Sequence, residues 1–210
     1  MSSSKKAITL AMTGASGALY GLRLLEILVQ AEQNIYLLLS QPAHIVLKME
    51  VDLALPKRAS DIERVLSQRY HAQAGQIQVF SEQQWTAPVA SGSALGRAMV
   101  ICPCTNGTLA GIANGLSRNL IERAADVTLK EQRKLILVHR ETPLSIIQLE
   151  NMLRLARAGA LILPANPAFY HSPTQISELI DFVVARVLDH LDIEHHLSGR
   201  WGETAYVDEA

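Results

Sequence analysis

A glycine-rich segment near the N-terminus, residues 13–21, constrains the fold of this chain more than any other feature. It follows the apolar run 7–12 and precedes leucines at helical spacing, so it predicts a sharp turn from a first strand into a first helix. Glycines let such a turn approach a ligand, and Ser16 offers a hydroxyl as a cap where the helix begins. The segment therefore predicts a phosphate-binding turn, and a tight turn without a ligand is the alternative.

Apolar runs that alternate with helical patterns organise the rest of the chain. Buried strands are predicted at five further runs: 35–39, 76–80, 98–102, 134–139 and 160–163. The alternation predicts a single α/β domain over residues 1–192, a doubly wound, mostly parallel sheet with helices on both faces. Residues 193–210 are predicted to form a C-terminal tail that contributes to the active site or to a subunit contact.

Capping residues predict where three of the helices begin. Ser60 with Glu63 has the spacing of a capping box, and so has Ser145 with Gln148. Ser172 is predicted as the N-cap of the last long helix, whose apolar residues from 176 to 191 form one stripe.

The composition argues against several classes of partner. Hydrophobic residues make up 49% of the 210 residues and charged residues 19%, so we expect part of the apolar surplus in subunit interfaces. The formal charge of −1, without a basic stripe, argues against nucleic-acid binding. No run approaches the roughly 18 apolar residues of a membrane span, and the first apolar run is too short for a signal peptide. A cytoplasmic protein without a membrane partner is expected.

The cysteines and a group of histidines offer no metal site. Cys102 and Cys104 end an apolar run and are predicted to be buried thiols rather than disulfide or zinc ligands. His190, His195 and His196 lie among acidic residues at a helix end, but their spacing fits no known ligand pattern. We therefore predict solvated histidines and no metal.

Polar residues that follow the predicted strands are candidates for a site, because ligands of an open parallel sheet bind outside the carboxyl ends of its strands. They are Ser16, Ser40, 105–108, Arg140 with Glu141, and 166–170. Residues 103–108 predict a second strand-to-helix turn, so that two turns form the walls of one crevice. Ser40 stands where a NAD site would carry an acid for the ribose, which argues against NAD.

Arginine and acidic side chains in this set suit a phosphorylated ligand. Arg140 can bind a phosphate bidentately, and Glu141 is a candidate proton donor or acceptor; a solvated ion pair is the alternative. Arg123, which lies near acidic residues on one helix, could equally form surface ion pairs. Trp201, an aromatic residue in a polar tail, is expected to cover a ligand or a neighbouring subunit.

Six motifs together make the chain similar to the UbiX-type flavin prenyltransferases, over nearly its whole length. They are 13–21, 103–104 followed by 108–113, 123–127, 129–131, 140–144 and 167–170. The resemblance implies a flavodoxin-like or Rossmann-like domain and a transferase that joins the dimethylallyl group of dimethylallyl monophosphate to N5 and C6 of reduced FMN, without a metal. It further implies that the prenylated FMN is the cofactor of a UbiD-type decarboxylase in ubiquinone or aromatic acid metabolism. Members are usually dodecamers with active sites between subunits.

The same resemblance implies roles for individual residues. The catalytic residues would be Ser16 near flavin N5, Glu50 as acceptor of the C6 proton and Glu141 as proton donor to the phosphate. Substrate-binding residues would be Lys130, Arg140, Tyr170, Arg186 and Trp201. Residues that bind FMN would be Gly14, Ala15, Ser16, Ser40, Thr105, Asn106, Gly107, Thr108 and Arg123. Relatives commonly have a Ser-x-Lys-Thr loop after the Pro-Cys pair, whereas residues 105–108 lack that lysine, so this flavin contact differs.

Three other functions remain to be weighed. A short-chain NAD(P)-dependent reductase would need a Tyr-x-x-x-Lys pair and an acid for the ribose, and the chain has neither. A decarboxylase of the phosphopantothenoylcysteine decarboxylase type would share the fold and FMN. A flavin carrier would bind FMN without turnover.

Overall fold

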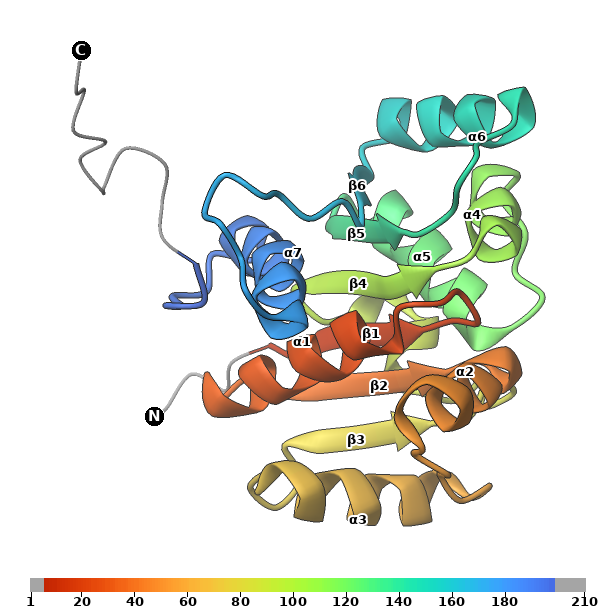
Figure 1. The fold of residues 1–210 in the computed structure, drawn as a ribbon. Helices are drawn as coiled ribbons and strands as arrows, with labels where there is room; N and C mark the ends of the chain where they lie inside the picture. The colour runs from red at the N-terminus through yellow and green to blue at the C-terminus, as the bar shows by residue number, and fades with distance from the viewer. Residues whose placement is uncertain (1–5, 199–210) are drawn as a thin grey trace. The chain divides into compact units, whose positions relative to one another are not determined.

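A six-stranded sheet forms the centre of the first of two compact units in the computed structural model, which describes residues 6–198 (Figure 1). The units are residues 1–165 and 166–210. The strands are β1 (Ile8–Met12), β2 (Ile35–Leu39), β3 (Ile77–Phe80), β4 (Ala98–Cys104), β5 (Lys134–His139) and β6 (Leu161–Pro164). All five pairings are parallel, in the order β3-β2-β1-β4-β5-β6 of a Rossmann sheet, which confirms the predicted fold class.

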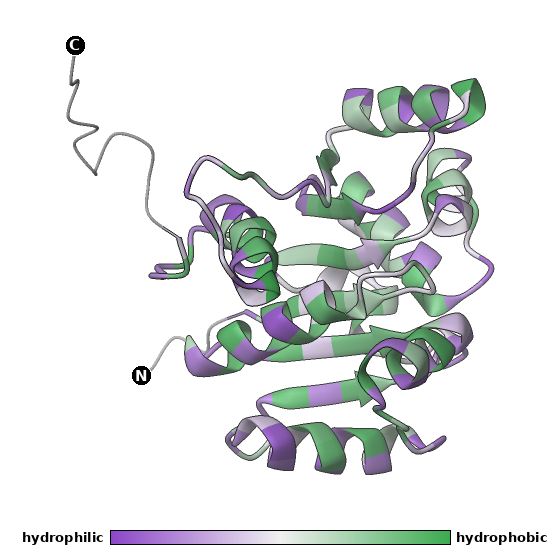
Figure 2. Ribbon diagram, viewed as in Figure 1, coloured by the Kyte–Doolittle hydropathy of each residue, from purple (hydrophilic) through white to green (hydrophobic). Residues whose placement is uncertain are grey.

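Helices cover both faces of this sheet. They are α1 (Ala18–Gln30), α2 (Gln41–Val51), α3 (Ala59–Tyr70), α4 (Asn106–Ala113), α5 (Leu120–Lys130) and α6 (Ile146–Arg157), with short 3₁₀ turns η1 (Pro88–Ala90) and η2 (Gly92–Ala94). Helix α1 packs on the face that carries the Met12 side chain, whereas Thr128 of α5 contacts Met99 on the opposite face. Figure 2 shows the strands mainly in hydrophobic green, with hydrophilic purple concentrated on helices and loops. The core therefore consists of two apolar layers, one on each side of the sheet.

One of the two predicted capping boxes in this unit is present. The Ser145 hydroxyl accepts from the amide of Gln148, and the Gln148 side chain accepts from the amide of Ser145. The box at Ser60 is wrong, because α3 already begins at Ala59 and Glu63 instead accepts from the amide of Val79 at 3.1 Å. That carboxylate satisfies a backbone group of β3, the strand at the sheet's edge.

The second unit contains α7 (Ile176–His190). Its predicted N-cap, Ser172, is wrong: the N-cap is Gln175, three residues later, where the Glu178 carboxylate accepts from the amides of Thr174 and Gln175. Most of the predicted apolar stripe is buried, whereas Ile176 is exposed. The predicted boundary between residues 192 and 193 stays a prediction.

Two sequence predictions concern the environment of the chain. Among residues 6–198, no helix is long and apolar enough to span a lipid bilayer. Cys102 and Cys104 are free and buried, as predicted, and burial raises the pKa of the Cys104 thiol to about 12. Both thiols are therefore protonated at neutral pH.

Glu122 of α5 is a buried carboxylate that forms an ion pair with the exposed Arg118 side chain, and the strength of this pair depends on pH. The Glu122 side chain is only 3% exposed and accepts from the Arg118 side chain at 2.7 Å and from the Arg118 amide at 2.8 Å. Burial alone would raise the pKa of Glu122, but the hydrogen bonds and charge of Arg118 outweigh it and hold that pKa below its usual value. The pair therefore stabilises the fold above the unfolded-state pKa, and this stabilisation is lost as pH falls through the lowered pKa.

We expect Glu122→Gln to lower the free energy of unfolding by about 2 kcal/mol at pH 7, because it removes charged hydrogen bonds around a buried side chain. The difference from the wild type should shrink as pH falls through the lowered pKa of Glu122, because the wild-type carboxylate is then protonated as well. Urea unfolding at pH 7 and at the lowest pH at which both proteins stay folded measures this. Glu26→Gln, which removes a partly exposed ion pair with Arg23, is the control and should cost less than about 0.5 kcal/mol. An equal loss at both pH values would contradict the role of charge.

Candidate active site

The turns that follow β1 and β4 are joined by the buried side chain of Thr13. Its Oγ1 donates to the carbonyl oxygen of Pro103 at 2.7 Å and accepts from the amide of Thr105 at 2.9 Å. The amide of Thr13 also donates to the Pro103 oxygen, at 3.2 Å. The two turns predicted as walls of one crevice therefore lie side by side at the carboxyl edge of the sheet.

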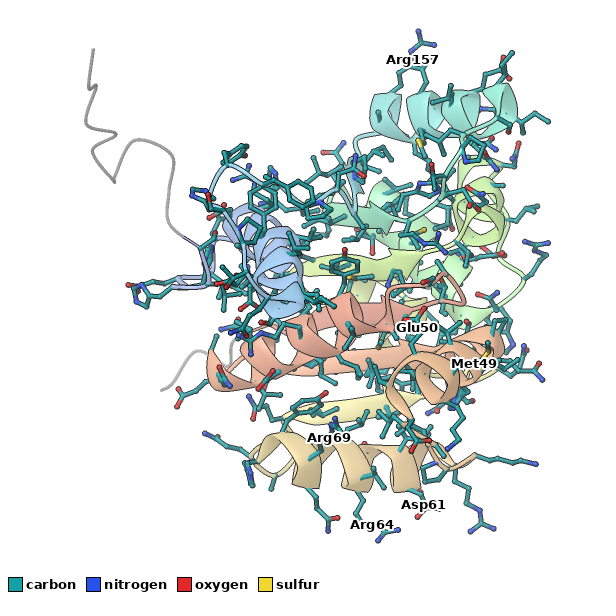
Figure 3. All side chains as sticks on the ribbon, in the orientation of Figure 1. Met49, Glu50, Asp61, Arg64, Arg69 and Arg157 are labelled. Atoms are coloured by element: carbon teal, nitrogen blue, oxygen red, sulfur yellow. The ribbon has the colours of Figure 1, made fainter. Side chains whose placement is uncertain are left out.

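The N-terminus of α1 is occupied by the carboxylate of Glu50, at the end of α2 (Figure 3). Glu50 accepts from the amide of Gly17 at 3.0 Å, from the amide of Ala18 at 2.8 Å and from the Ser16 hydroxyl. The prediction that Ser16 caps the helix is wrong. The N-cap is Gly17, whose φ of 111° favours glycine and which has no side chain to cap the helix. An acidic side chain distant in the sequence thus fills the anion position of this helix.

These contacts keep Glu50 ionised. Partial burial raises its pKa, but the hydrogen bonds from Ser16, Gly17 and Ala18, together with the nearby charge of Arg140, outweigh burial and lower the pKa below its usual value. The Glu50 side chain is nevertheless exposed at the mouth of the turn. Glu50 is therefore a carboxylate that a ligand can reach and that can accept a proton.

Arg140, directly after β5, lies against the same turn. Its Nε donates to the carbonyl oxygen of Ser16 at 3.0 Å, which leaves the two terminal nitrogens for other partners. Those nitrogens make no hydrogen bond with any residue between 6 and 198. A guanidinium held by one nitrogen, with its terminal fork open, suits a phosphate.

Three amides of the β1–α1 turn are also open. Within the described part of the chain, the amides of Gly14, Ala15 and Ser16 donate to no other group. The predicted flavin residue Ser40 lies beside this turn: its amide donates to Met12 at 3.0 Å, and its hydroxyl accepts from the amide of Ala43 as the cap of α2. The turn thus offers amide donors to an acceptor-rich ligand, which satisfies one requirement of an FMN site.

The β4–α4 turn presents polar side chains from the start of α4. Thr105 is the N-cap, and its hydroxyl accepts from the amide of Thr108 and donates to the Thr108 hydroxyl. Asn106 donates from Nδ2 to Glu141 at 2.6 Å, and its Oδ1 lies 2.6 Å from Nε2 of His139. His139, Asn106 and Glu141 therefore form one hydrogen-bonded group, and Thr105 and Thr108 form a second one in the same turn.

Arg123 and Lys130 do not join either group. Arg123, on α5, donates to the carbonyl oxygen of Ala90 at 3.2 Å and pairs with Asp126 at 2.9 Å. Lys130 pairs with Glu131 at 2.6 Å. Both side chains contact residues 88–94 or acidic neighbours on or next to α5. Neither contacts the β1–α1 turn within the described chain, so their predicted binding roles require another subunit or a ligand.

Tyr170 and Arg186 belong to the second unit, where each has local contacts. The Tyr170 ring packs edge-on against His171 and Phe182, and Arg186 pairs with Asp189 at 2.6 Å. Trp201 lies outside the described residues.

The histidines near the C-terminal end of α7 are not all solvated. His195 is nearly buried and lies 3.1 Å from Asp189, which corrects the sequence prediction for this residue. Among residues 6–198, no three histidine, cysteine or acidic side chains are grouped so that they could hold a metal ion.

A cavity of about 580 Å³ lies beside α2, between residues of β2, α3 and the end of β3. His44 and Lys57 are among its lining residues, whereas none of the predicted site residues is. It is therefore distinct from the site at the β1–α1 turn.

Comparison with known proteins decides between the families considered. The flavoprotein family model matches residues 1–188. The flavin prenyltransferase UbiX of Pseudomonas aeruginosa is 54% identical over 202 residues, which cover 96% of this chain and 97% of the relative. The chain belongs to the UbiX flavin prenyltransferases, within the flavoprotein family. The resemblance inferred from the sequence motifs is therefore confirmed.

Solved structures of UbiX proteins share the fold of this family member. One, of AnUbiX (PadA1) in complex with FMN and dimethylallyl pyrophosphate, has a TM-score of 0.84 and 40% identity, covering 95% of this chain and 99% of that one. Another, a dodecameric FMN-dependent UbiX-like decarboxylase from Escherichia coli O157:H7, has a TM-score of 0.81 and 39% identity, covering 93% and 98%.

His139 is a polar residue at this candidate site that the sequence analysis did not single out. It is the last residue of β5, next to Arg140, and its side chain is buried under Asn106 and Glu141. A polar residue directly after the four apolar residues 135–138 of a strand was the available signal.

Proposed function

We propose that this UbiX-type flavin prenyltransferase joins the dimethylallyl group of dimethylallyl monophosphate to N5 and C6 of reduced FMN and releases phosphate. The observation that carries the proposal is the meeting of Ser16, ionised Glu50 and Arg140 at one turn with open amide donors. Family membership and the relative that binds FMN and dimethylallyl pyrophosphate support it.

The residues of the first turn would share the work of binding and proton transfer. The amides of Gly14, Ala15 and Ser16, with Ser40 and residues 105–108 nearby, would hold FMN, which supplies the nucleophilic N5 and C6 when reduced. Ser16 would orient N5 by a hydrogen bond, and Glu50 would accept the proton lost at C6. Both residues are exposed at the turn, which supports these roles.

Cations would stabilise the leaving phosphate. Breaking the allylic C–O bond leaves negative charge on the phosphate, and the open fork of Arg140 is placed to bind that charge as it develops. Glu141, beside Arg140, would then pass a proton to the phosphate. Lys130, Arg186, Tyr170 and Trp201 would complete the phosphate and prenyl site, and Arg123 the flavin site.

An assembly would bring these remaining residues to the site. The contacts of Arg123 and Lys130 within the chain do not include the β1–α1 turn, so we propose that they serve a site formed with another subunit. Exposed apolar side chains on α6, including Ile146, Ile147 and Leu153, support self-association, as does the dodecameric relative. A homododecamer is the proposed state.

The product would serve as the cofactor of a UbiD-type decarboxylase, and the cytoplasmic location expected from the sequence stays a prediction. Two other functions remain outcomes of the test below. A decarboxylase of the phosphopantothenoylcysteine type would consume a carboxylate substrate, and a carrier would return its flavin unchanged.

The decisive experiment incubates the protein with reduced FMN and dimethylallyl monophosphate without oxygen, and measures the mass of the extracted flavin. We expect a flavin heavier by one C₅H₈ unit and one equivalent of inorganic phosphate. A parallel reaction with dimethylallyl pyrophosphate determines which prenyl phosphate is preferred. An unchanged flavin mass in both reactions would overturn the proposal.

A further inference from the structure

Three side chains form a continuous hydrogen-bonded relay from the end of β5 to the open side of the site. His139 Nε2 lies 2.6 Å from Asn106 Oδ1, and Asn106 Nδ2 lies 2.6 Å from Glu141 Oε2. The other carboxylate oxygen of Glu141 accepts from the amide of Thr142 at 3.1 Å. The exposed Glu141 side chain is thus held at both oxygens.

The direction of each hydrogen bond in the relay follows from its chemistry. A carboxylate only accepts, so the amide nitrogen of Asn106 must face Glu141, and the amide oxygen must then face His139. An amide oxygen also only accepts, so His139 must donate, with its proton on Nε2. The hydrogen bond from Asn106 Nδ2 to Glu141 Oε2 therefore fixes both the orientation of Asn106 and the tautomer of His139.

The surroundings of His139 keep its ring neutral and in place. Its side chain is buried, with 2% of the residue exposed, and it stands opposite Cys104 across the β4–β5 pairing. Burial lowers the pKa of His139, and the positive charge of Arg140 lowers it further. The negative charge of Glu141 raises the pKa, but the net result is a lowered value. A neutral imidazole on a rigid strand is a fixed donor, unlike a flexible surface side chain.

We propose that His139 is a positioning residue of the prenyl-transfer site, which holds the Glu141 carboxylate in its reactive position through Asn106. This inference rests on the proposed function, because Glu141 is taken to exchange a proton with the prenyl phosphate. It also gives a function to Asn106, which precedes Gly107, the position in the 105–108 loop where relatives commonly carry a lysine. In this chain the loop contributes the Asn106 side-chain amide, which orients the Glu141 carboxyl group.

The kinetic test compares His139→Leu with His139→Gln. Leucine removes the donor to Asn106, and kcat should fall about 10- to 100-fold, because a misplaced catalytic group slows the reaction by about this factor. The affinity for FMN should change less than about twofold. Glutamine can place its amide N–H near the Nε2 position and should restore kcat to within about threefold of the wild type. Circular dichroism and thermal midpoints establish that both variants are folded. Equal activity of the leucine variant and the wild type would overturn the proposal.

A double-mutant cycle separates positioning from general damage. In an Asn106→Ala background, His139→Leu should lower kcat by no more than about twofold further, because the relay is already broken. Full additivity of the two losses would mean that His139 acts by another route and would overturn the proposal.

A measurement that needs no turnover distinguishes this inference from the proposed function. In the protein labelled with ¹⁵N-histidine, His139, assigned by its absence in His139→Gln, should show a protonated Nε2 and an unprotonated Nδ1 at pH 7, and Asn106→Ala should shift both signals. The opposite tautomer, or an imidazolium, would overturn the relay even in an active enzyme. The expected tautomer in a protein that leaves flavin unchanged would instead retain the relay and reject prenyl transfer.

Discussion

Glu50→Gln should reduce kcat for prenyl transfer by about 100- to 10,000-fold, the usual contribution of a positioned acid or base. Both amides, of Gly17 and Ala18, donate to the same oxygen, Oε2, and the glutamine oxygen can take its place, so the turn should keep its shape. The amide cannot take up a proton, however, so the step that removes the C6 proton loses its acceptor. Stopped-flow absorbance of the bound flavin measures the rate, and fluorescence titration should show FMN affinity within about threefold of the wild type.

Glu178 provides a matched control for this substitution. Its carboxylate likewise accepts hydrogen bonds from backbone amides at the start of a helix, here α7. These hydrogen bonds, from the amides of Gln175 and Thr174, lower the pKa of Glu178. Glu178→Gln should therefore weaken a helix terminus in the same way and leave prenyl transfer within about twofold. If both variants lose activity equally, the effect comes from the helix terminus, and Glu50 is not the proton acceptor.

Gly21→Ala should destabilise the protein by about 3 kcal/mol, which corresponds to a fall of roughly 6 to 12 °C in Tm. Gly21 lies where α1 crosses β1 and β4. A Cβ there would lie 2.4 Å from the carbonyl oxygen of Cys102 and 2.6 Å from the Met12 side chain. The carbonyl belongs to the central strand of the sheet, so the helix has to move away, and the turn that precedes it moves as well.

Gly107→Ala is the control, because Gly107 also lies in a helix but a Cβ there would meet nothing within 4 Å. Alanine should stabilise that helix by about 0.5 to 1 kcal/mol. Differential scanning calorimetry of both variants checks the prediction. A Tm for Gly21→Ala within 1 °C of the wild type would show that α1 does not pack on the sheet as described.

The strands and most helices could be predicted because each depends on residues close in the sequence. Five of the six strands overlap their predicted runs almost entirely, and the Ser145 box is present, since a capping box needs only four neighbouring residues. Ser16 and Ser60 were misassigned for a physical reason. Glu50, 34 residues from Ser16, occupies the helix end, and Glu63 binds a strand 16 residues away.

The site could be predicted only in part. The glycine turn and the polar residues after strands indicated Ser16, Arg140 and residues 105–108. This was possible because the carboxyl ends of parallel strands all lie at the same edge of the sheet. The relay through His139 could not be predicted, because it depends on which amide atom faces which neighbour. Arg123 and Lys130 match site residues of the family in sequence, but within one chain they contact Ala90 and Glu131. The residue spacing of a single chain does not show which residues meet at an interface between copies.

The place of Glu50 at the start of α1 has a consequence for repeated turnover. A proton bound by this carboxylate removes the negative charge that faces the positive end of the helix and weakens the hydrogen bonds from Gly17 and Ala18. Because the lowered pKa favours the ionised form, the accepted proton leaves again at neutral pH. In the proposed reaction, the helix terminus would thus regenerate the base after each cycle without a second residue to reset it.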